Sequence, residues 1–357
     1  MNLSQQSWRQ WVWPFVVSLG LLFIVSGCAM FEDEETAKGK KIYRHYCMHC
    51  HGESGKQGEG FNWDSLSSMD FPPPKDLSDS SMSDSISDED IFNAISREMK
   101  DTADPKVVDD VDYFGVATMP TFKYTLSEME IWSLVRYVRS LHGGDFTFDV
   151  NARRQQLEAE LESATQELET ATQALEAAET KRDEEIEAAE AAAEAAGDED
   201  FEAEEIELPE EEIATEAAIK HKKAKLAFES FAKRPKMTVS RPDLTVSDEQ
   251  RAELEKTGKH LYFNKYGCNS CHSIEGQGGL VGPELDRAGF RLNDTWVYKW
   301  LMYPQGIKKH TRMPNLGFND QDARAVTAYL GTLRAPKPDR SIASGVSEEV
   351  SSESNPE

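Results

Sequence analysis

Cysteine is scarce in this chain, which limits the kinds of site that it can form. Only five cysteines occur among 357 residues, and four of them fall into two short strings that each hold a C-x-x-C pair. A zinc site would require further cysteines or paired histidines around such a pair. A redox-active dithiol is another general use of C-x-x-C. The residues that flank each pair therefore indicate whether it forms a zinc site, a redox-active dithiol or another kind of site.

Apolar and basic residues are also few. Hydrophobic residues make up 39% of the chain, which is low for one compact globule of this length and predicts a modular layout. The formal net charge is −26, and residues 153–212 hold 23 acidic against 4 basic side chains, a balance of −19. Most of the negative charge thus belongs to one segment. Such acidity does not suit a nucleic-acid partner.

Both cysteine pairs are followed at once by a histidine, at residues 47–51 and again at 268–272. This C-x-x-C-H pattern is typical of c-type haem attachment. Two thiols three residues apart can add to the vinyl groups of one porphyrin, and the histidine then lies beneath the iron as its proximal ligand. We therefore predict two covalently bound haem c groups, each with one iron. The predicted haem-binding residues are Cys47, Cys50, Cys268 and Cys271, and the predicted proximal ligands are His51 and His272.

A ligand for the other face of each iron is offered by Met119 and Met313, which both precede a proline and a probable helix. For the first haem, three other methionines compete with Met119, namely Met69, Met82 and Met99. For the second haem, His310 competes with Met313. Two histidine ligands would lower the reduction potential, whereas a thioether raises it.

The segments around each string also correspond to one another. Gly39 precedes Tyr43 by four residues ahead of the first string, and Gly258 precedes Tyr262 in the same way ahead of the second. Four residues place glycine and tyrosine on one helical face, and glycine lets another helix approach closely. Serine and asparagine caps predict a last helix in each half, over 128–141 and 320–333.

Together these motifs resemble class I cytochrome c, over residues 37–145 and 246–334. The resemblance implies two all-α domains in which an edge of each haem is open to solvent. It also implies that the carbonyl of Pro283 accepts a hydrogen bond from the proximal histidine and orients its ring. Residues 72–77 occupy the comparable place in the first domain, and the sequence leaves open which of their prolines serves there.

The N-terminus resembles a bacterial lipoprotein signal. Residues 1–28 contain an apolar run and end in Val-Ser-Gly-Cys, in which Cys28 is the predicted lipidation site. An uncleaved transmembrane anchor is the alternative, because residues 11–31 are about long enough to span a bilayer. We therefore expect a membrane-bound protein that faces the periplasm of a Gram-negative bacterium, with inner or outer membrane left open.

The middle of the chain, residues 151–234, predicts an acidic helical hairpin that resembles a coiled coil. Residues 153–196 lack proline and glycine and carry about three heptads, which favours one long helix. A second helix from about 210 to 233 is rich in lysine, so the two helices complement each other in charge. Residues 335–357 have the composition of a disordered tail.

From these observations we predict a membrane-anchored dihaem cytochrome that carries single electrons between respiratory redox partners and performs no enzymatic reaction. Its acidity leads us to expect partners with a basic docking surface. An alternative is a cytochrome subunit of a larger respiratory complex (an oxidase, a nitric oxide reductase or a quinol-oxidising complex), because residues 296–316 look similar to such subunits. A dihaem peroxidase is a weaker alternative, since it needs an iron with an open sixth position.

Overall fold

The computed structural model describes residues 33–69, 71–100, 118–197 and 206–336. The predicted signal with Cys28 and nearly all of the predicted tail lie outside these residues. Within the described part, the secondary structure is helical apart from two short strands, β1 (Ser273–Ile274) and β2 (Gln277–Gly278), which pair antiparallel. The prediction of an all-α protein with a long helical insertion is confirmed.

The N-terminal domain, here the described residues from 33 to 149, is built on two packed helices. A capping box between Ser127 and Glu130 starts α7, and Gly39 of α2 brings the two helices into contact, since a Cβ there would lie 1.9 Å from the carbonyl oxygen of Ser133. The predicted last helix over 128–141 is thus observed one residue longer. The helices are α2 (Glu34–Tyr46), α3 (Met48–His51), α4 (Phe61–Ser67), α5 (Met82–Ser85), α6 (Asp88–Ser96) and α7 (Glu128–His142).

The C-terminal domain, residues 235–336, repeats this design. Gly258 of α10 lies against α14, where a Cβ would come within 2.0 Å of the carbonyl oxygen of Ala325. The side chain of Asn319 caps α14, as predicted. The helices are α10 (Asp248–His260), the π-helical turn η1 (Leu261–Lys265), the 3₁₀ turn η2 (Cys268–Ser270), α11 (Ala288–Arg291), α12 (Asp294–Met302), α13 (Pro304–Ile307) and α14 (Asp320–Thr332).

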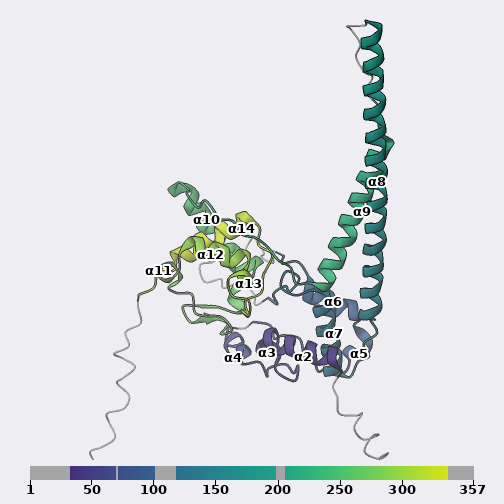
Figure 1. Cartoon of the computed structure of the whole chain (residues 1–357). Helices are drawn as coiled ribbons and strands as arrows, with labels where there is room; N and C mark the ends of the chain where they lie inside the picture. Colours follow the sequence, from purple (N-terminus) through teal and green to yellow (C-terminus); the bar gives the residue numbers. More distant parts are fainter. Residues whose placement is uncertain (1–32, 70, 101–117, 198–205, 337–357) are drawn as a thin grey trace, which may run out of the picture.

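Between the domains, α8 (Val150–Ala196) and α9 (Pro209–Ala232) lie side by side and form an arm that projects from the N-terminal domain (Figure 1). At 1.5 Å per residue, α8 is about 70 Å long, and α9 can cover only about half of it. Small buried side chains, Ala164 and Ala171 on α8 and Ala217 on α9, line the contact. Lys220 of α9 bonds Glu167 of α8 at 2.6 Å, which agrees with the predicted charge complementarity.

The base of the arm belongs to the core of the N-terminal domain. Val150 and Leu157 of α8 and Phe231 of α9 are buried in the same apolar cluster as the helices α2, α6 and α7. Arg234, just after α9, donates to both carboxylate oxygens of Glu130. The arm therefore begins and ends at the N-terminal domain, and residues 233–247 then lead to α10, the first helix of the C-terminal domain.

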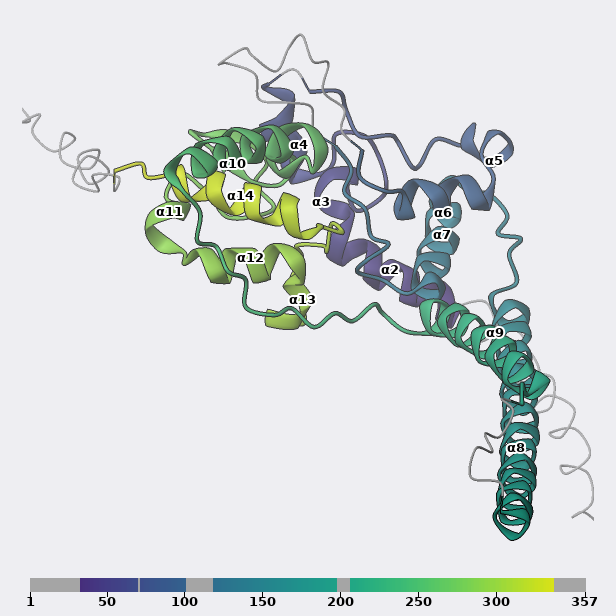
Figure 2. The same cartoon turned by 90° about the horizontal axis from the view of Figure 1, so that it is seen from above.

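The two domains touch, as Figure 2 shows from above. Helix α4 of the N-terminal domain lies beside strand β2 of the C-terminal domain. Further contact is made where the backbone N–H of Asn315 donates to the hydroxyl of Thr125 at 2.8 Å. Among the described residues, we find no helix whose length and apolar content would let it cross a bilayer.

Candidate haem sites

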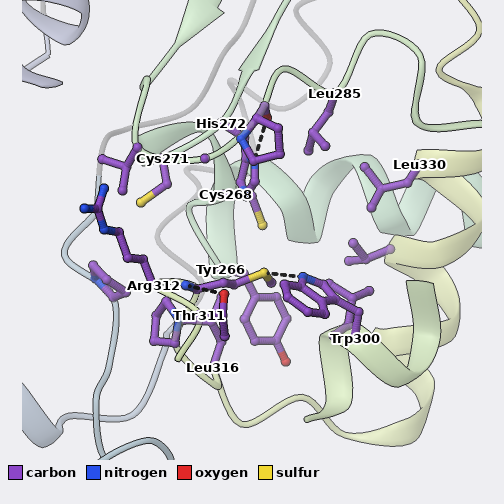
Figure 3. A pocket seen from close by; sticks show the side chains of 18 of the residues that line it. Tyr266, Cys268, Cys271, His272, Leu285, Trp300, Thr311, Arg312, Leu316 and Leu330 are labelled. Carbon is purple, nitrogen blue, oxygen red and sulfur yellow. Dashed lines mark hydrogen bonds between the residues drawn. The ribbon is translucent and has the colours of Figure 1, made fainter. Parts of the chain in front are cut away.

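The C-terminal domain holds a cavity of about 710 Å³. It contains the second cysteine string, and Figure 3 shows Cys268, Cys271 and His272 with Leu285, Leu316 and Leu330 around it. Helices α12 and α14 supply part of the apolar wall, through Trp296, Val297, Trp300, Leu301, Val326 and Leu330. A flat apolar macrocycle suits such a cavity.

His272 is held in the orientation that an iron ligand needs. Its Nδ1–H donates to the carbonyl of Pro283 at 2.7 Å, which confirms the contact expected from the resemblance. This bond fixes the tautomer and leaves Nε2 to bind a metal. Burial lowers the pKa of His272, and the bond to Pro283 opposes this only in part, so the ring is neutral. A neutral imidazole is the form that coordinates iron.

The cysteines of this string are not set up as a reactive dithiol. Burial raises the pKa of both Cys268 and Cys271 to about 12. Redox-active and zinc-binding cysteines require an easily formed thiolate, so these surroundings disfavour both alternatives weighed from the sequence. Covalent attachment of a porphyrin remains the use that fits.

Met313 lines the same cavity as His272, as does its rival His310. The sulfur of Met313 accepts a hydrogen bond from Nε1 of Trp300 at 2.7 Å, drawn as a dashed line in Figure 3. Its carbonyl accepts a second bond from Gln305. His310 is exposed. The geometry is compatible with Met313 as sixth ligand, which stays a prediction.

Replacement of Trp300 by phenylalanine should lower the reduction potential of the second haem. A donor on the thioether sulfur withdraws electron density from the iron and favours the ferrous state, so its loss favours the ferric state. Potentiometric titration followed by absorbance would measure the change. Trp296→Phe is the matched control, because Trp296 stacks on Trp300 but donates no bond to Met313 that the structure records. An equal potential in parent and Trp300→Phe would contradict this role.

Basic side chains outnumber acidic ones around the cavity, where Glu284 is the acidic lining residue, although the protein as a whole is acidic. Arg291, Lys308 and Arg312 line the cavity. A haem carries two carboxylate side chains, and guanidinium and ammonium groups are their natural partners. The N-terminal domain contributes to the lining as well, through His45, Thr118 and Pro120. These cations belong to no sequence motif, because Arg291 ends α11 whereas Lys308 and Arg312 lie in the loop after α13.

The first string begins at Cys47, between α2 and α3, and continues along α3 of the N-terminal domain. Burial raises the pKa of Cys47 to about 12, and burial also raises that of Cys50. The Nδ1–H of His51 donates to the carbonyl of Lys75 at 3.1 Å. The residue that orients this ring is thus not a proline but the lysine that follows three of them. Burial lowers the pKa of His51, so this ring is neutral too.

Met119 packs, partly buried, against the core of the N-terminal domain. Its three rivals are engaged elsewhere. The sulfur of Met69 accepts a bond from the N–H of Gly278, and Met99 packs on the core of the C-terminal domain. Met82 is buried at the start of α5. Met119 therefore remains the predicted sixth ligand of the first haem.

The residues of both sites fit the predicted cofactor. Each site presents two protonated thiols, a neutral histidine with a free Nε2 and a predicted methionine ligand. When bound, a haem supplies an iron that cycles between the ferrous and ferric states. The chain itself sets the potential through its ligands and through burial.

Comparison with known families agrees with this geometry. Residues 34–138 match the family described as cytochrome c oxidase, cbb3-type, subunit III, and residues 255–334 match the family described as cytochrome c. Searches of curated proteins and of solved structures returned no match. The chain therefore contains two cytochrome c domains, which is consistent with a dihaem c-type cytochrome of class I and implies two covalently bound haem c groups.

Proposed function

We propose that this protein is a membrane-anchored cytochrome that carries single electrons between respiratory redox partners on the periplasmic side of a Gram-negative cell. The observation that carries the proposal is the pair of C-x-x-C-H sites, each with its histidine oriented by a backbone carbonyl. Such sites hold a haem in one place and change its charge by one electron, and they need no substrate pocket. The resemblance of residues 1–28 to a lipoprotein signal that ends in Cys28 supports the anchor and the location.

A subunit of a larger respiratory complex is the second candidate. The match of residues 34–138 to a cbb3-type oxidase subunit supports this candidate. The arm would then serve as an assembly element, and its acidic surface would suit a basic partner. Contacts of this kind weaken as salt screens the charges. A peroxidase is less well supported, because both domains supply a methionine.

The chain should contain two haems when it is produced together with haem-attachment machinery. Intact mass and pyridine haemochrome spectra would count them. Replacing Cys268 and Cys271 together by serine should leave one haem, and replacing Cys47 and Cys50 should leave the other. Colourless protein, or a parent chain with fewer than two haems, would refute the proposed function.

Purification in mild detergent separates the carrier from the subunit. A stable complex of fixed stoichiometry favours the subunit, whereas a haem protein that is purified alone and reduces or oxidises a soluble partner favours the carrier. Peroxide turnover by the isolated protein would instead support the peroxidase. Labelling with a radioactive fatty acid, lost in Cys28→Ala, would test the anchor.

A further inference from the structure

A single buried side chain lies between the two haem-attachment strings. Asn62, on α4 of the N-terminal domain, has no solvent-exposed surface. Its Nδ2 group donates to the carbonyl of Ser270 at 2.9 Å and to the sulfur of Cys50 at 3.3 Å. Its Oδ1 accepts from the backbone N–H of Leu280. One amide thus contacts the first string directly and the second string through its backbone.

Two glycines allow this close approach. A Cβ at Gly60 would lie 2.5 Å from the carbonyl oxygens of His49 and Cys50, so α4 can begin only if this residue has no side chain. A Cβ at Gly279 would lie 2.2 Å from the carbonyl oxygen of Ser270. Gly60 in the N-terminal domain and Gly279 in the C-terminal domain therefore both allow Asn62 to lie against the two strings.

Neighbouring hydrogen bonds hold the same contact between α4 and β2, here called the α4–β2 junction. The hydroxyl of Ser65, also on α4, donates to the carbonyl of Gly278 at 2.6 Å. The N–H of Thr118 donates to the hydroxyl of Ser270 at 2.6 Å. Both bonds cross between the domains. One joins α4 to β2, and the other joins the residue before Met119 to the second string.

The bonds of Asn62 also form a short continuous path. The path runs from the sulfur of Cys50 to the Asn62 amide, from there to the carbonyl of Ser270, and across one peptide bond to Cys271. The sulfurs of these two cysteines are atoms predicted to bond a porphyrin, so the path joins the two cofactor positions.

We propose that Asn62 is a positioning residue that couples the two haems into one electron-transfer unit, with an electron passing directly between them across the α4–β2 junction. The inference rests on the proposed function. In the step, one ferrous iron becomes ferric and the other ferric iron becomes ferrous, and no proton or bond is exchanged. Tunnelling falls steeply with distance, which is why a fixed short contact matters.

The chemistry of the residue supports a dedicated role. A buried polar group is costly unless it is hydrogen-bonded, so packing alone would favour leucine at this position. Asn62 instead uses both its donor and its acceptor on backbone atoms of the other domain. Its removal would leave the N–H of Leu280 without the bond to Asn62. The two haem-attachment strings would then be held less firmly relative to each other.

The test uses the full chain with both haems bound, in a sample that has received enough reductant to convert half of the haems to the ferrous state. Exchange spectroscopy by proton NMR would follow electron hopping between the haem methyl signals of the two domains. In the parent protein, this exchange should be independent of protein concentration. Asn62→Ala should slow it by about tenfold or more, because small displacements of reacting groups have large effects on rate. Equal exchange in parent and variant would overturn the proposal.

Hydrogen exchange gives a second readout that needs no electron transfer. The amide of Leu280 should exchange about tenfold faster in Asn62→Ala, in line with the loss of one hydrogen bond. Ser67→Ala is the matched control, since Ser67 lies on α4, is exposed and bonds only the carbonyl of Asp64 in its own helix. An unchanged Leu280 amide in Asn62→Ala would show that the junction does not exist in solution.

Haem counting keeps this test separate from that of the proposed function. If the parent and Asn62→Ala both carry two haems and exchange electrons between them at the same rate, the proposed role of Asn62 is refuted, but the proposed function is not. If the parent carries no haem, the function itself is refuted. Asn62→Gln should recover part of the exchange rate, because it keeps the amide but displaces it.

Discussion

Replacing Met313 by alanine is expected to lower the reduction potential of one haem by about a few tenths of a volt, since axial ligands set potentials over a range of about 0.8 V. The thioether is a soft ligand that favours ferrous iron, and water or a histidine in its place favours the ferric state. The potential of the other haem should not change. Potentiometric titration with optical detection would resolve the two.

The same experiment decides between Met313 and His310. Both residues line the cavity, but only the sulfur of Met313 is held by a hydrogen bond, from Trp300. The methionine-to-iron charge-transfer band of one haem should disappear in Met313→Ala and persist in His310→Ala. The reverse pattern would identify His310 as the ligand and would imply a lower potential for the native site.

The second large effect concerns stability. Replacement of Asp88 by asparagine is expected to destabilise the N-terminal domain by about 3 to 5 kcal/mol, because it leaves a buried cation without its partner. Asp88 and Arg139 form an ion pair with 2.6 Å between Oδ1 and Nε, and their side chains are only 2% and 5% exposed. The other oxygen of Asp88 accepts from the N–H and hydroxyl of Thr147.

These bonds tie three segments together, since Asp88 begins α6, Arg139 belongs to α7 and Thr147 lies at the start of the arm. Denaturant unfolding at pH 7 would measure the loss. Glu89→Gln, an exposed neighbour on α6, is the control. A loss below about 1 kcal/mol in Asp88→Asn would be typical of an exposed pair and would contradict the burial.

Acid should reveal the same ion pair. Burial raises the pKa of Asp88, but the bonds from Thr147 and Arg139 outweigh it and hold the pKa below its ordinary value of 3.8. A carboxyl with a depressed folded pKa contributes stability that is complete above the unfolded pKa and is lost as the pH falls through the folded one. The parent should therefore lose stability below about pH 3.8, and Asp88→Asn should lack this part of the acid transition.

The arm and the cavity differ in charge, which affects how partners would bind. The excess of acid over residues 153–212 lies on α8, on the segment that follows it and at the start of α9, whereas Arg291, Lys308 and Arg312 line the second cavity. The prediction of a partner with a basic surface therefore applies to the arm. The cations that line the cavity around Cys268 and Cys271 would favour acidic groups instead.

Much of this protein could be predicted from its sequence alone. The strings at 47–51 and 268–272 carry the attachment and ligation chemistry within five residues, so no tertiary contact is needed to recognise them. The cap at Ser127 and the glycines at 39 and 258 act within a single helix or on its nearest neighbour. Absence of proline and glycine made the long helix α8 predictable in the same way.

Other features depend on residues that are distant in the chain and came only from the tertiary structure. Lys75 orients His51, Trp300 holds Met313, and Asn62 joins the two strings across 208 positions to Ser270. Lys75 lies in the segment 72–77 and Trp300 in the run 296–316, but neither pattern predicts these bonds, because a hydrogen bond depends on where folding places a donor and an acceptor. The sequence by itself determined which atoms can hold two haems, and only the packing of α4 on the C-terminal domain decided that the two attachment strings meet.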